Sequence, residues 1–278
     1  MARWVAWNTL THAFILFPTA VAISIAYFPA PAWQDIAIGA LVHFVLTCFS
    51  MSVMLHRYFS HAAYKANRGV TILLAAAACL AYQYGPIWWS SKHRRHHKEC
   101  DKPKDPHSWA NYGLGYAWIG WTMHPHEQHI DMEYVHRNFK YGNKNDGKVR
   151  SELKVIDDFF FVPTWLMHAF LIFGLGIPLH TVCYRYTMPT ALCSIATLWF
   201  NCKFHPPTEL AEMVCNSIDL LHDPLAACHG EAYHKDHHKH PRRAKRPGPD
   251  LGYFLMILPL QTLGILGTSK GVDLKHAM

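Results

Sequence analysis

The residues of this sequence best suited to chemistry are histidines that gather in short clusters. Nine of them matter most, namely His56 and His61, His93, His96 and His97, His205, and His234, His237 and His238. In a helix, residues three and four positions apart lie on one face, so each HxxHH cluster can direct three imidazoles toward one point. Imidazole binds iron, zinc, copper and nickel, and a zinc ion needs only three or four protein ligands. Nine histidines therefore predict a site for two metal ions with an open coordination position.

Neighbouring residues complete this predicted site. His56 and His61 are five residues apart, about 140° around a helix, so they cannot chelate one ion from a single helical face. We expect them to reach a shared site from a helix end. Asn201 precedes His205 by four positions and shares its helix face. Four nearby carboxylates are expected to orient the rings and temper the metal charge: Asp101, Asp105, Glu231 and Asp236.

The composition indicates that a membrane positions these clusters. The chain has 278 residues, of which 51% are hydrophobic and 16% are charged, whereas soluble domains have about 25% charged residues. Four apolar segments are long enough to cross a bilayer, at residues 9–28, 35–55, 159–179 and 188–204. The short connectors "PAPAWQ" and "HTVCYRYT" join them in pairs. The predicted fold is therefore an all-α membrane protein with four transmembrane helices in two hairpins.

The positive charges predict the orientation of these hairpins. Residues 56–158 contain 15 of the 26 lysines and arginines, and residues 202–278 contain nine. Because such residues favour the cytoplasmic side, both termini and all nine clustered histidines are predicted to be cytoplasmic. Residues 56–158 and 205–278 would form a helical cap that holds the di-metal site, within a single domain 1–278. The membrane would be the endoplasmic reticulum in a eukaryote or the inner membrane in a bacterium.

Two further apolar runs and the cysteines give smaller predictions. The run "VTILLAAAACLAYQYGPIWW" is interrupted at Gly85-Pro86, so we expect a helix buried in protein or lying at the membrane interface. The run "DLGYFLMILPLQTLGILG" contains Pro259 and predicts an interfacial helix. The eight cysteines form no CxxC pair, which favours reduced packing residues, without a disulfide or a thiolate metal site.

Basic residues between the histidines favour an anionic partner. Arg94, Arg95 and Lys98 accompany the second cluster, where a phosphate-bearing headgroup or an acidic electron-donor protein could dock. A nucleic acid is not expected, because the apolar spans and the histidines give the charge another role.

These motifs together resemble those of the membrane fatty-acyl desaturases, specifically the Δ9 acyl-CoA desaturase type. The resemblance rests on "HRYFSHAAYKA", "GPIWWSSKHRRHHKECDKPKDPHS", "HGEAYHKDHH" and "DLGYFLMILPLQTLGI", and it extends over about residues 44–265. Three regions depart from the family pattern: Met51 and Met54 stand where glycines are usual, and residues 206–231 and 239–250 differ. These departures leave the acyl carrier and the product open.

The resemblance implies a function and a set of ligands. The nine clustered histidines would hold two Fe2+ ions, and Asn201 would reach one of them through water. A long-chain acyl-CoA or acyl-lipid would lie in a bent tunnel, with Gln83, Trp89 and Thr197 at the bend and Phe44 and Cys48 at its far end. O2 would be the co-substrate. A separate cytochrome b5 or ferredoxin-type protein would supply electrons, because no HPGG-type heme motif is present.

Two alternatives remain beside a desaturase. The same iron chemistry could give a hydroxylated or an acetylenic product, and the sequence does not separate these outcomes. A membrane metal transporter or sensor would instead need ionisable residues inside its spans. The four apolar segments contain no carboxylate after Asp35, which disfavours the transporter.

Overall fold

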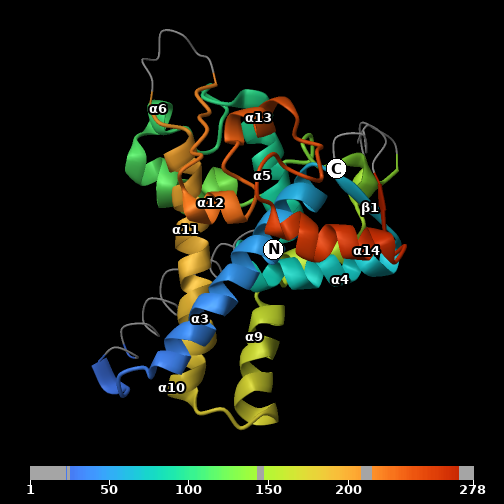
Figure 1. Cartoon of the computed structure of the whole chain (residues 1–278). Coiled ribbons are helices and arrows are strands. Elements are labelled where there is room, and N and C mark those ends of the chain that lie inside the picture. The colour runs from blue at the N-terminus through green and yellow to red at the C-terminus, as the bar shows by residue number, and fades with distance from the viewer. Residues whose placement is uncertain (1–22, 24–25, 143–146, 208–214, 269–278) are drawn as a thin grey trace.

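The computed structural model describes Ile23 and residues 26–142, 147–207 and 215–268, so most of the predicted first span lies outside the described residues. The regular structure of this part of the chain is helical except for two short antiparallel strand pairs. Strand β1 (Tyr64–Ala66) pairs with β4 (Leu266–Thr268), and β2 (Lys140–Tyr141) pairs with β3 (Lys148–Val149). Helices α3, α9 and α11 form a narrow stem below a broader helical cap (Figure 1).

One long helix connects the stem to the cap. Helix α3 (Trp33–Val45) continues through η2 (Leu46–Ser60), whose wider turns are of the π type. Among the described residues it is the one helix that is by itself long and apolar enough to cross a membrane. Its first half exposes Trp33 and Leu41, whereas nearly all of its second half is buried. The helix therefore extends beyond the predicted span 35–55, because its last turns are covered by the cap rather than by lipid.

The second predicted hairpin has a shorter turn than expected. Helix α9 (Val162–Ala169) with η7 (Phe170–Gly174) is followed by one continuous helical stretch made of α10 (Leu179–Val182), η8 (Cys183–Thr187) and α11 (Met188–Phe204). The connector prediction for "HTVCYRYT" is thus wrong, since these residues are helical. The chain reverses at residues 175–178 instead, where Gly176 adopts φ +64° and Pro178 precedes the new helix.

The apolar run after the first histidine pair is bent, as the Gly85-Pro86 dipeptide predicts. Helix α4 (Arg68–Ala78) and the turn η3 (Cys79–Ala81) are followed by α5 (Pro86–Glu99), at an angle of 78°. Asp157 of α8 (Ser151–Asp158) accepts hydrogen bonds from the backbone N–H groups of Ile87 and Trp88, so it caps α5. A Cβ atom at position 85 would lie 2.1 Å from the Asp157 carboxylate, so only glycine fits there.

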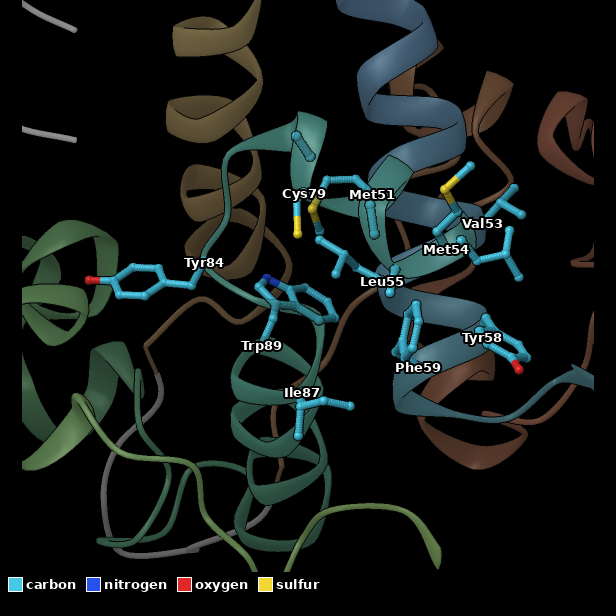
Figure 2. Close-up of a cluster of buried hydrophobic side chains, with 14 of the residues drawn as sticks. Met51, Val53, Met54, Leu55, Tyr58, Phe59, Cys79, Tyr84, Ile87 and Trp89 are labelled. Carbon is cyan, nitrogen blue, oxygen red and sulfur yellow. The ribbon is translucent and has the colours of Figure 1, made fainter. Parts of the chain in front are cut away.

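A buried apolar cluster fixes α5 beside η2. Met51, Leu55 and Phe59 of η2 pack in the same cluster as Ile87 and Trp89 of α5, as Figure 2 shows. Because α5 and η2 carry histidines at their cap ends, this packing determines how those side chains meet.

Short helices complete the cap. They are α6 (Trp109–Tyr112), η4 (Tyr116–Gly120), α7 (Trp121–Met123), η5 (Pro125–Glu127), η6 (Arg137–Phe139), α12 (Pro224–Cys228) and α13 (His234–Lys239). The last helix consists of η10 (Tyr253–Ile257) and α14 (Leu258–Thr262). It buries Tyr253 and Ile257 and exposes Phe254 and Leu255. This two-sided character agrees with the predicted interfacial helix.

Candidate metal centre

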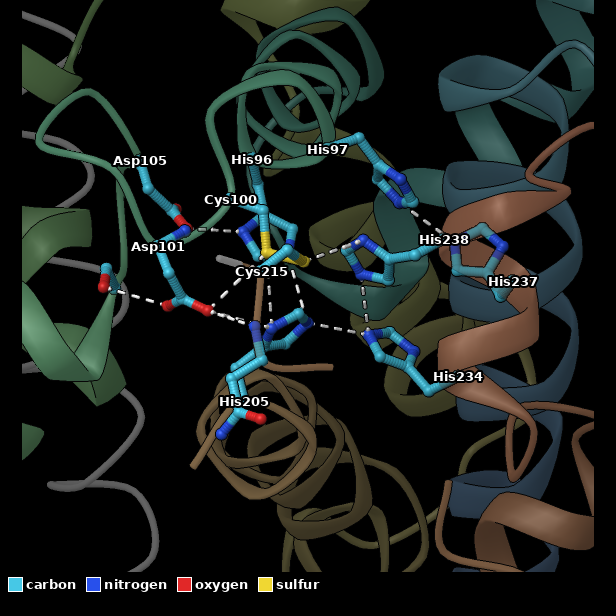
Figure 3. The surroundings of a disulfide bond; sticks show 12 residues. His96, His97, Cys100, Asp101, Asp105, His205, Cys215, His234, His237 and His238 are labelled. Atoms are coloured by element: carbon cyan, nitrogen blue, oxygen red, sulfur yellow. Dashed lines mark hydrogen bonds and ion pairs between the residues drawn. A yellow bond between two sulfur atoms is a disulfide. The ribbon is translucent and has the colours of Figure 1, made fainter. Parts of the chain in front are cut away.

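The nine clustered histidines converge in the cap as two sets. The five-histidine set consists of His56, His61, His93, His97 and His237, whose Nε2 atoms form a chain of contacts of 2.8–3.0 Å. The four-histidine set consists of His96, His205, His234 and His238, linked in the same way at 3.0–3.2 Å. Each set draws its side chains from three or more separate parts of the chain. Figure 3 shows the four-histidine set with His97 and His237 beside it.

Each HxxHH cluster divides between the two sets, which differs from the prediction that its three rings point to one site. His93 and His97 belong to the five-histidine set, and His96 belongs to the other. On α13, His234 and His238 join the four-histidine set, and His237 does not. The reason is helical geometry, because adjacent residues point about 100° apart whereas residues four apart point almost the same way. One helix can therefore supply ligands to two neighbouring ions.

The nitrogen spacing suits a bound metal in each set. Two imidazole nitrogens at about 2.1 Å from one ion and at right angles to each other lie about 3.0 Å apart. Two rings also have their outward nitrogens fixed by carboxylates: His56 Nδ1 lies 3.1 Å from Glu231, and His96 Nδ1 lies 2.9 Å from Asp105. When the proton is on Nδ1, Nε2 carries a free lone pair that points inward. This is the tautomer that binds a metal. The donor sets therefore fit two ions such as iron.

Burial keeps these rings in the neutral form that ligands require. The pKa of His61, His234, His237 and His238 lies well below the ordinary histidine value, first because the rings are buried and then because neighbouring positive groups disfavour a further charge. Burial would raise the pKa of Asp105, but His96 and His107 beside it lower the pKa well below the usual range. The carboxylate thus stays ionised beside its histidine.

The four predicted orienting carboxylates have different surroundings. Glu231 and Asp105 contact ligand rings as described, and Asp101 lies 4.0 Å from His205 Nδ1. Asp236 instead pairs with His240 and Arg243 at the surface. Its side chain makes none of the described contacts to the nine rings, because it points away from the face of α13 that carries them.

A buried arginine that the sequence analysis overlooked supports the five-histidine set. Arg57 is fully buried and forms an ion pair of 2.8 Å with Asp250 and one of 3.5 Å with Glu231. It also donates a 2.7 Å hydrogen bond to the backbone carbonyl of His229. Its position directly after a ligand, His56, was the only signal available in the sequence. The contacts attach the C-terminal part of the chain to the helix that carries His56.

A cavity opens onto both histidine sets. It is lined by His56 and His93 of one set and His234 of the other, with Trp89 and Thr197 in its wall. Most of the surface that the wall exposes is apolar, with contributions from Met51, Ala196, Phe200 and Leu225, although polar and charged residues also line it: Asn201, Lys203, Asp223 and Glu231. The ring of Trp89 stacks on His93 at a centroid distance of 4.9 Å. Such a space can hold an apolar chain against the metal ligands.

The other three predicted tunnel residues, Phe44, Cys48 and Gln83, are not among the residues that line this cavity. The ring of Phe44 lies 5.4 Å from that of His229, which does line the cavity. Cys48 is fully buried in the long helix. Gln83 donates a hydrogen bond to the backbone carbonyl of Ser194, which ties the bend before α5 to α11.

The predicted docking arginines are used inside the cap. Arg94 donates hydrogen bonds to the backbone carbonyls of Tyr134 and Ser60. Arg95 pairs with Glu127 and Asp131. Lys98 is the exposed member of the three, and it pairs with Glu133. Sequence position alone does not reveal that carboxylates 32–36 residues away pair with Arg95 and Lys98.

One prediction about the cysteines is wrong. Cys100 and Cys215 form a disulfide, whereas the other six cysteines are unpaired. The two residues are 115 positions apart in the sequence, so no local spacing pattern could have indicated the pair. They meet because Cys100 ends α5 and Cys215 lies in the segment that follows α11.

Comparison with known proteins places this arrangement in a family. The family model described as Fatty acid desaturase matches residues 31–246, which include all nine clustered histidines. The chain belongs to the fatty acid desaturase family. The expected relationship is thus established at the level of the family, whose members are oxidoreductases.

Individual desaturases and a related enzyme are similar to parts of the chain. A probable acyl-CoA desaturase of Schizosaccharomyces pombe is 30% identical over 125 residues, which are 44% of this chain and 26% of that protein. A hex-5-enoyl-(acyl-carrier protein) acetylenase of Moorena producens is 35% identical over 114 residues, 37% of this chain and 35% of that protein. A sn-2 palmitoyl-lipid 9-desaturase of Nostoc is 24% identical over 215 residues, 77% and 73% of the two chains. The chain spans about a quarter to a third of the length of the first two relatives.

Proposed function

We propose that this protein is a membrane acyl desaturase that introduces a cis double bond, at the Δ9 position, into a long-chain acyl-CoA or acyl-lipid. The observation that carries the proposal is the cavity that opens onto both histidine sets and exposes a mainly apolar surface. A substrate in this cavity would have its methylenes beside both metal positions at once.

The proposed chemistry divides between metal and protein. Two bound iron ions would activate O2 with electrons from an external donor and remove two hydrogens from adjacent methylenes. The five-histidine and four-histidine sets would hold one ion each. Asn201 would contact the ion of the four-histidine set through water. Trp89 and Thr197 would hold the chain in place and exclude water from the reacting carbons.

The membrane arrangement is part of the same proposal. Besides the long helix, the described chain contains two bent apolar helix pairs, so up to three segments could cross a membrane by length and composition. We propose four spans in two hairpins, with the fourth at 188–204 and the first at 9–28. The excess of lysine and arginine in residues 56–158 supports a cytoplasmic cap. Lys98, as the exposed basic residue of α5, would contact the headgroup or the electron donor.

The far end of the cavity would select the chain length. We place this end at His229, a lining residue whose ring Phe44 contacts, so Phe44→Ala should extend the space and shift the preferred acyl chain by one or more methylenes. Each additional buried methylene contributes about 0.8 kcal/mol, or roughly a fourfold change in preference. Competition between acyl chains of different length measures the shift, with the exposed Phe254→Ala as control. An unchanged length profile would remove Phe44 from the cavity end.

An acetylenic product is the second candidate, because one similar protein is an acetylenase. Mass spectrometry of the product separates the outcomes. Loss of two hydrogens from a saturated chain indicates a desaturase, loss of two from an alkene indicates an acetylenase, and a retained oxygen atom indicates a hydroxylase.

The direct test uses a host that lacks its own desaturase. Expression of the protein should produce unsaturated fatty acids, and derivatisation of the double bond then gives its position. His96→Ala should abolish this product, whereas the exposed His222→Ala should leave it unchanged. An unaltered fatty-acid profile, with the wild-type protein present in the membrane and loaded with iron, would refute the desaturase proposal.

A further inference from the structure

The Cys100–Cys215 disulfide lies directly behind the four-histidine set (Figure 3). Cys100 follows the last residue of α5, the helix that carries His96. Cys215 lies between α11 and α13, which bring in the other three ligands of the set. Cys100 is buried, whereas Cys215 is partly exposed and can be approached from solvent. The bond therefore connects two segments that both hold ligands.

Each sulfur atom contacts the outward nitrogen of one ligand ring. Sγ of Cys100 lies 3.6 Å from Nδ1 of His205, and Sγ of Cys215 lies 3.6 Å from Nδ1 of His238. Both rings belong to the four-histidine set. In the hydrogen bonds of the described residues, no ring of the five-histidine set has a sulfur partner, so the disulfide can affect one metal position selectively.

The oxidation state of the sulfurs changes what these ring nitrogens can bond to. A disulfide sulfur is a weak acceptor whose position is fixed by the S–S bond, whereas the sulfur of a free cysteine can rotate toward the ring nitrogen and form a shorter hydrogen bond with it. The nearest carboxylate, Asp101, lies 4.0 Å from His205 Nδ1 and already accepts a 2.8 Å hydrogen bond from the backbone N–H of Asn216. Opening the disulfide therefore gives His205 and His238 a stronger partner than they have in the closed form.

The predicted location argues against a permanent disulfide. The cap is expected to face the cytoplasm, where thiols are kept reduced and disulfides are usually transient or redox-sensing. A pair of cysteines held with Cα atoms 5.0 Å apart can form and break the bond without rearranging the fold.

We propose that Cys100 and Cys215 are a reversible thiol–disulfide modification site that controls how firmly the four-histidine set holds its metal; this rests on the metal role proposed for that set. Hydrogen peroxide would be the oxidant: the two thiols lose two protons and two electrons, the S–S bond forms, and the peroxide becomes two waters. A dithiol reductant reverses the step by thiol–disulfide exchange and becomes a disulfide itself.

The first experiment tests the modification without any use of the metal. The purified full-length protein is treated with hydrogen peroxide or with dithiothreitol, its free thiols are alkylated, and its peptides are analysed by mass spectrometry. Cys100 and Cys215 should change together from two alkylated thiols to a disulfide and back. Cys228, which is also partly exposed but unpaired, should stay alkylated throughout. A pair that stays reduced at every peroxide concentration, or stays oxidised in dithiothreitol, would overturn the proposal.

The second experiment measures the effect on the metal. Iron is released from both redox forms into a chelator and followed by its absorbance. The oxidised form should release one of its two irons about tenfold faster than the reduced form does. Changing the hydrogen-bond partner of a metal ligand weakens metal binding by about ten- to a hundredfold, and we take the lower end of that range. The double variant Cys100→Ser/Cys215→Ser should release iron at one rate with and without peroxide, whereas Cys228→Ser should behave as wild type.

If the oxidised and reduced wild-type proteins released iron at equal rates, the proposal that the disulfide controls metal binding would be wrong. If the double variant folds poorly, the rates of iron release from the oxidised and reduced wild-type proteins still test the proposal. Protein that holds no iron would refute the proposed function, while the alkylation pattern would still show whether the pair is a reversible modification site.

Discussion

The five-histidine and four-histidine sets use the same side chain but are supported by different means. Around the first set, four of the five ligands lie in or next to η2 and α5, which pack together in the core, and the buried Arg57 connects Glu231 and Asp250 beside them. In the second set, His205 directly follows the last residue of α11, and the disulfide contacts the outer nitrogens of His205 and His238. One set is fixed by buried charges, and the other by a covalent bond that redox chemistry can open.

This difference suggests different responses of the two proposed ions. Buried ion pairs have no chemical switch, and removing one partner leaves the other charge unpaired. A disulfide can be cleaved without losing a residue. The five-histidine set should therefore respond mainly to loss of fold stability, and the four-histidine set to the redox state.

The largest expected effect comes from two adjacent residues that serve different sets. His237→Ala and His238→Ala each remove one ligand, from the five-histidine and the four-histidine set respectively. Changing a ligand's hydrogen-bond partner already costs ten- to a hundredfold, so each variant should lose more than about a hundredfold in activity and one of its two irons. Metal analysis and turnover check this. His240→Ala, at the exposed end of the same helix, is the control. Loss of both irons in either variant would show that the sets are not separate.

Removal of the buried arginine should mainly affect the fold. Arg57→Met leaves Asp250 buried without its ion-pair partner, so the free energy of unfolding should fall by about 3–5 kcal/mol. Arg68→Met removes an exposed pair with Glu152, for which about 0–1 kcal/mol is expected. Denaturant unfolding in detergent, followed by tryptophan fluorescence, gives both values. Equal losses would mean that the Arg57 network does not support the five-histidine set in the way described.

Changes to the orienting carboxylates should separate the sets at smaller cost. Glu231→Gln weakens the partner of His56, and Asp105→Asn weakens the partner of His96. Each should lower the affinity for one metal by about ten- to a hundredfold and leave the other metal bound. Equilibrium chelator titration measures this, and Asp236→Asn, which changes a carboxylate that faces away from the rings, should have no effect. If either variant bound both metals more weakly, the assignment of one carboxylate to each histidine set would be wrong.

The last effect concerns pH and acts on both histidine sets. His61, His234, His237 and His238 have folded-state pKa values well below the unfolded value of about 6.5. As pH falls below 6.5 the unfolded chain binds protons that the folded rings refuse, so metal-free protein should lose stability, by up to about 1.4 kcal/mol per pH unit and histidine. Thermal midpoints between pH 7.5 and 5.5 test this sign. A midpoint that does not change would mean that the rings protonate freely in the fold.

The sequence predicts the ligands far better than their surroundings. The histidine clusters, including the two HxxHH motifs, and the apolar runs beside them sufficed to predict nine histidines in one region and the break at Gly85-Pro86. The assignment of His96 and His237 to opposite sets could not be predicted, because it depends on how α5 and α13 face each other. The partners of Arg57, Arg95 and Cys100 lie 32 to 193 residues away in the sequence, so they are invisible without the fold.

The order in which the chain is synthesised limits when the centre can form. The ligand at residue 56 meets a ligand at residue 237, Arg57 next to it binds Asp250, and strand β1 pairs with β4 at residues 266–268. Each of these pairs joins an early segment to one made almost 200 residues later. The early histidines must therefore wait in an incomplete cap, and the proposed metal ions should bind only after the segment up to about residue 268 has been released from the ribosome.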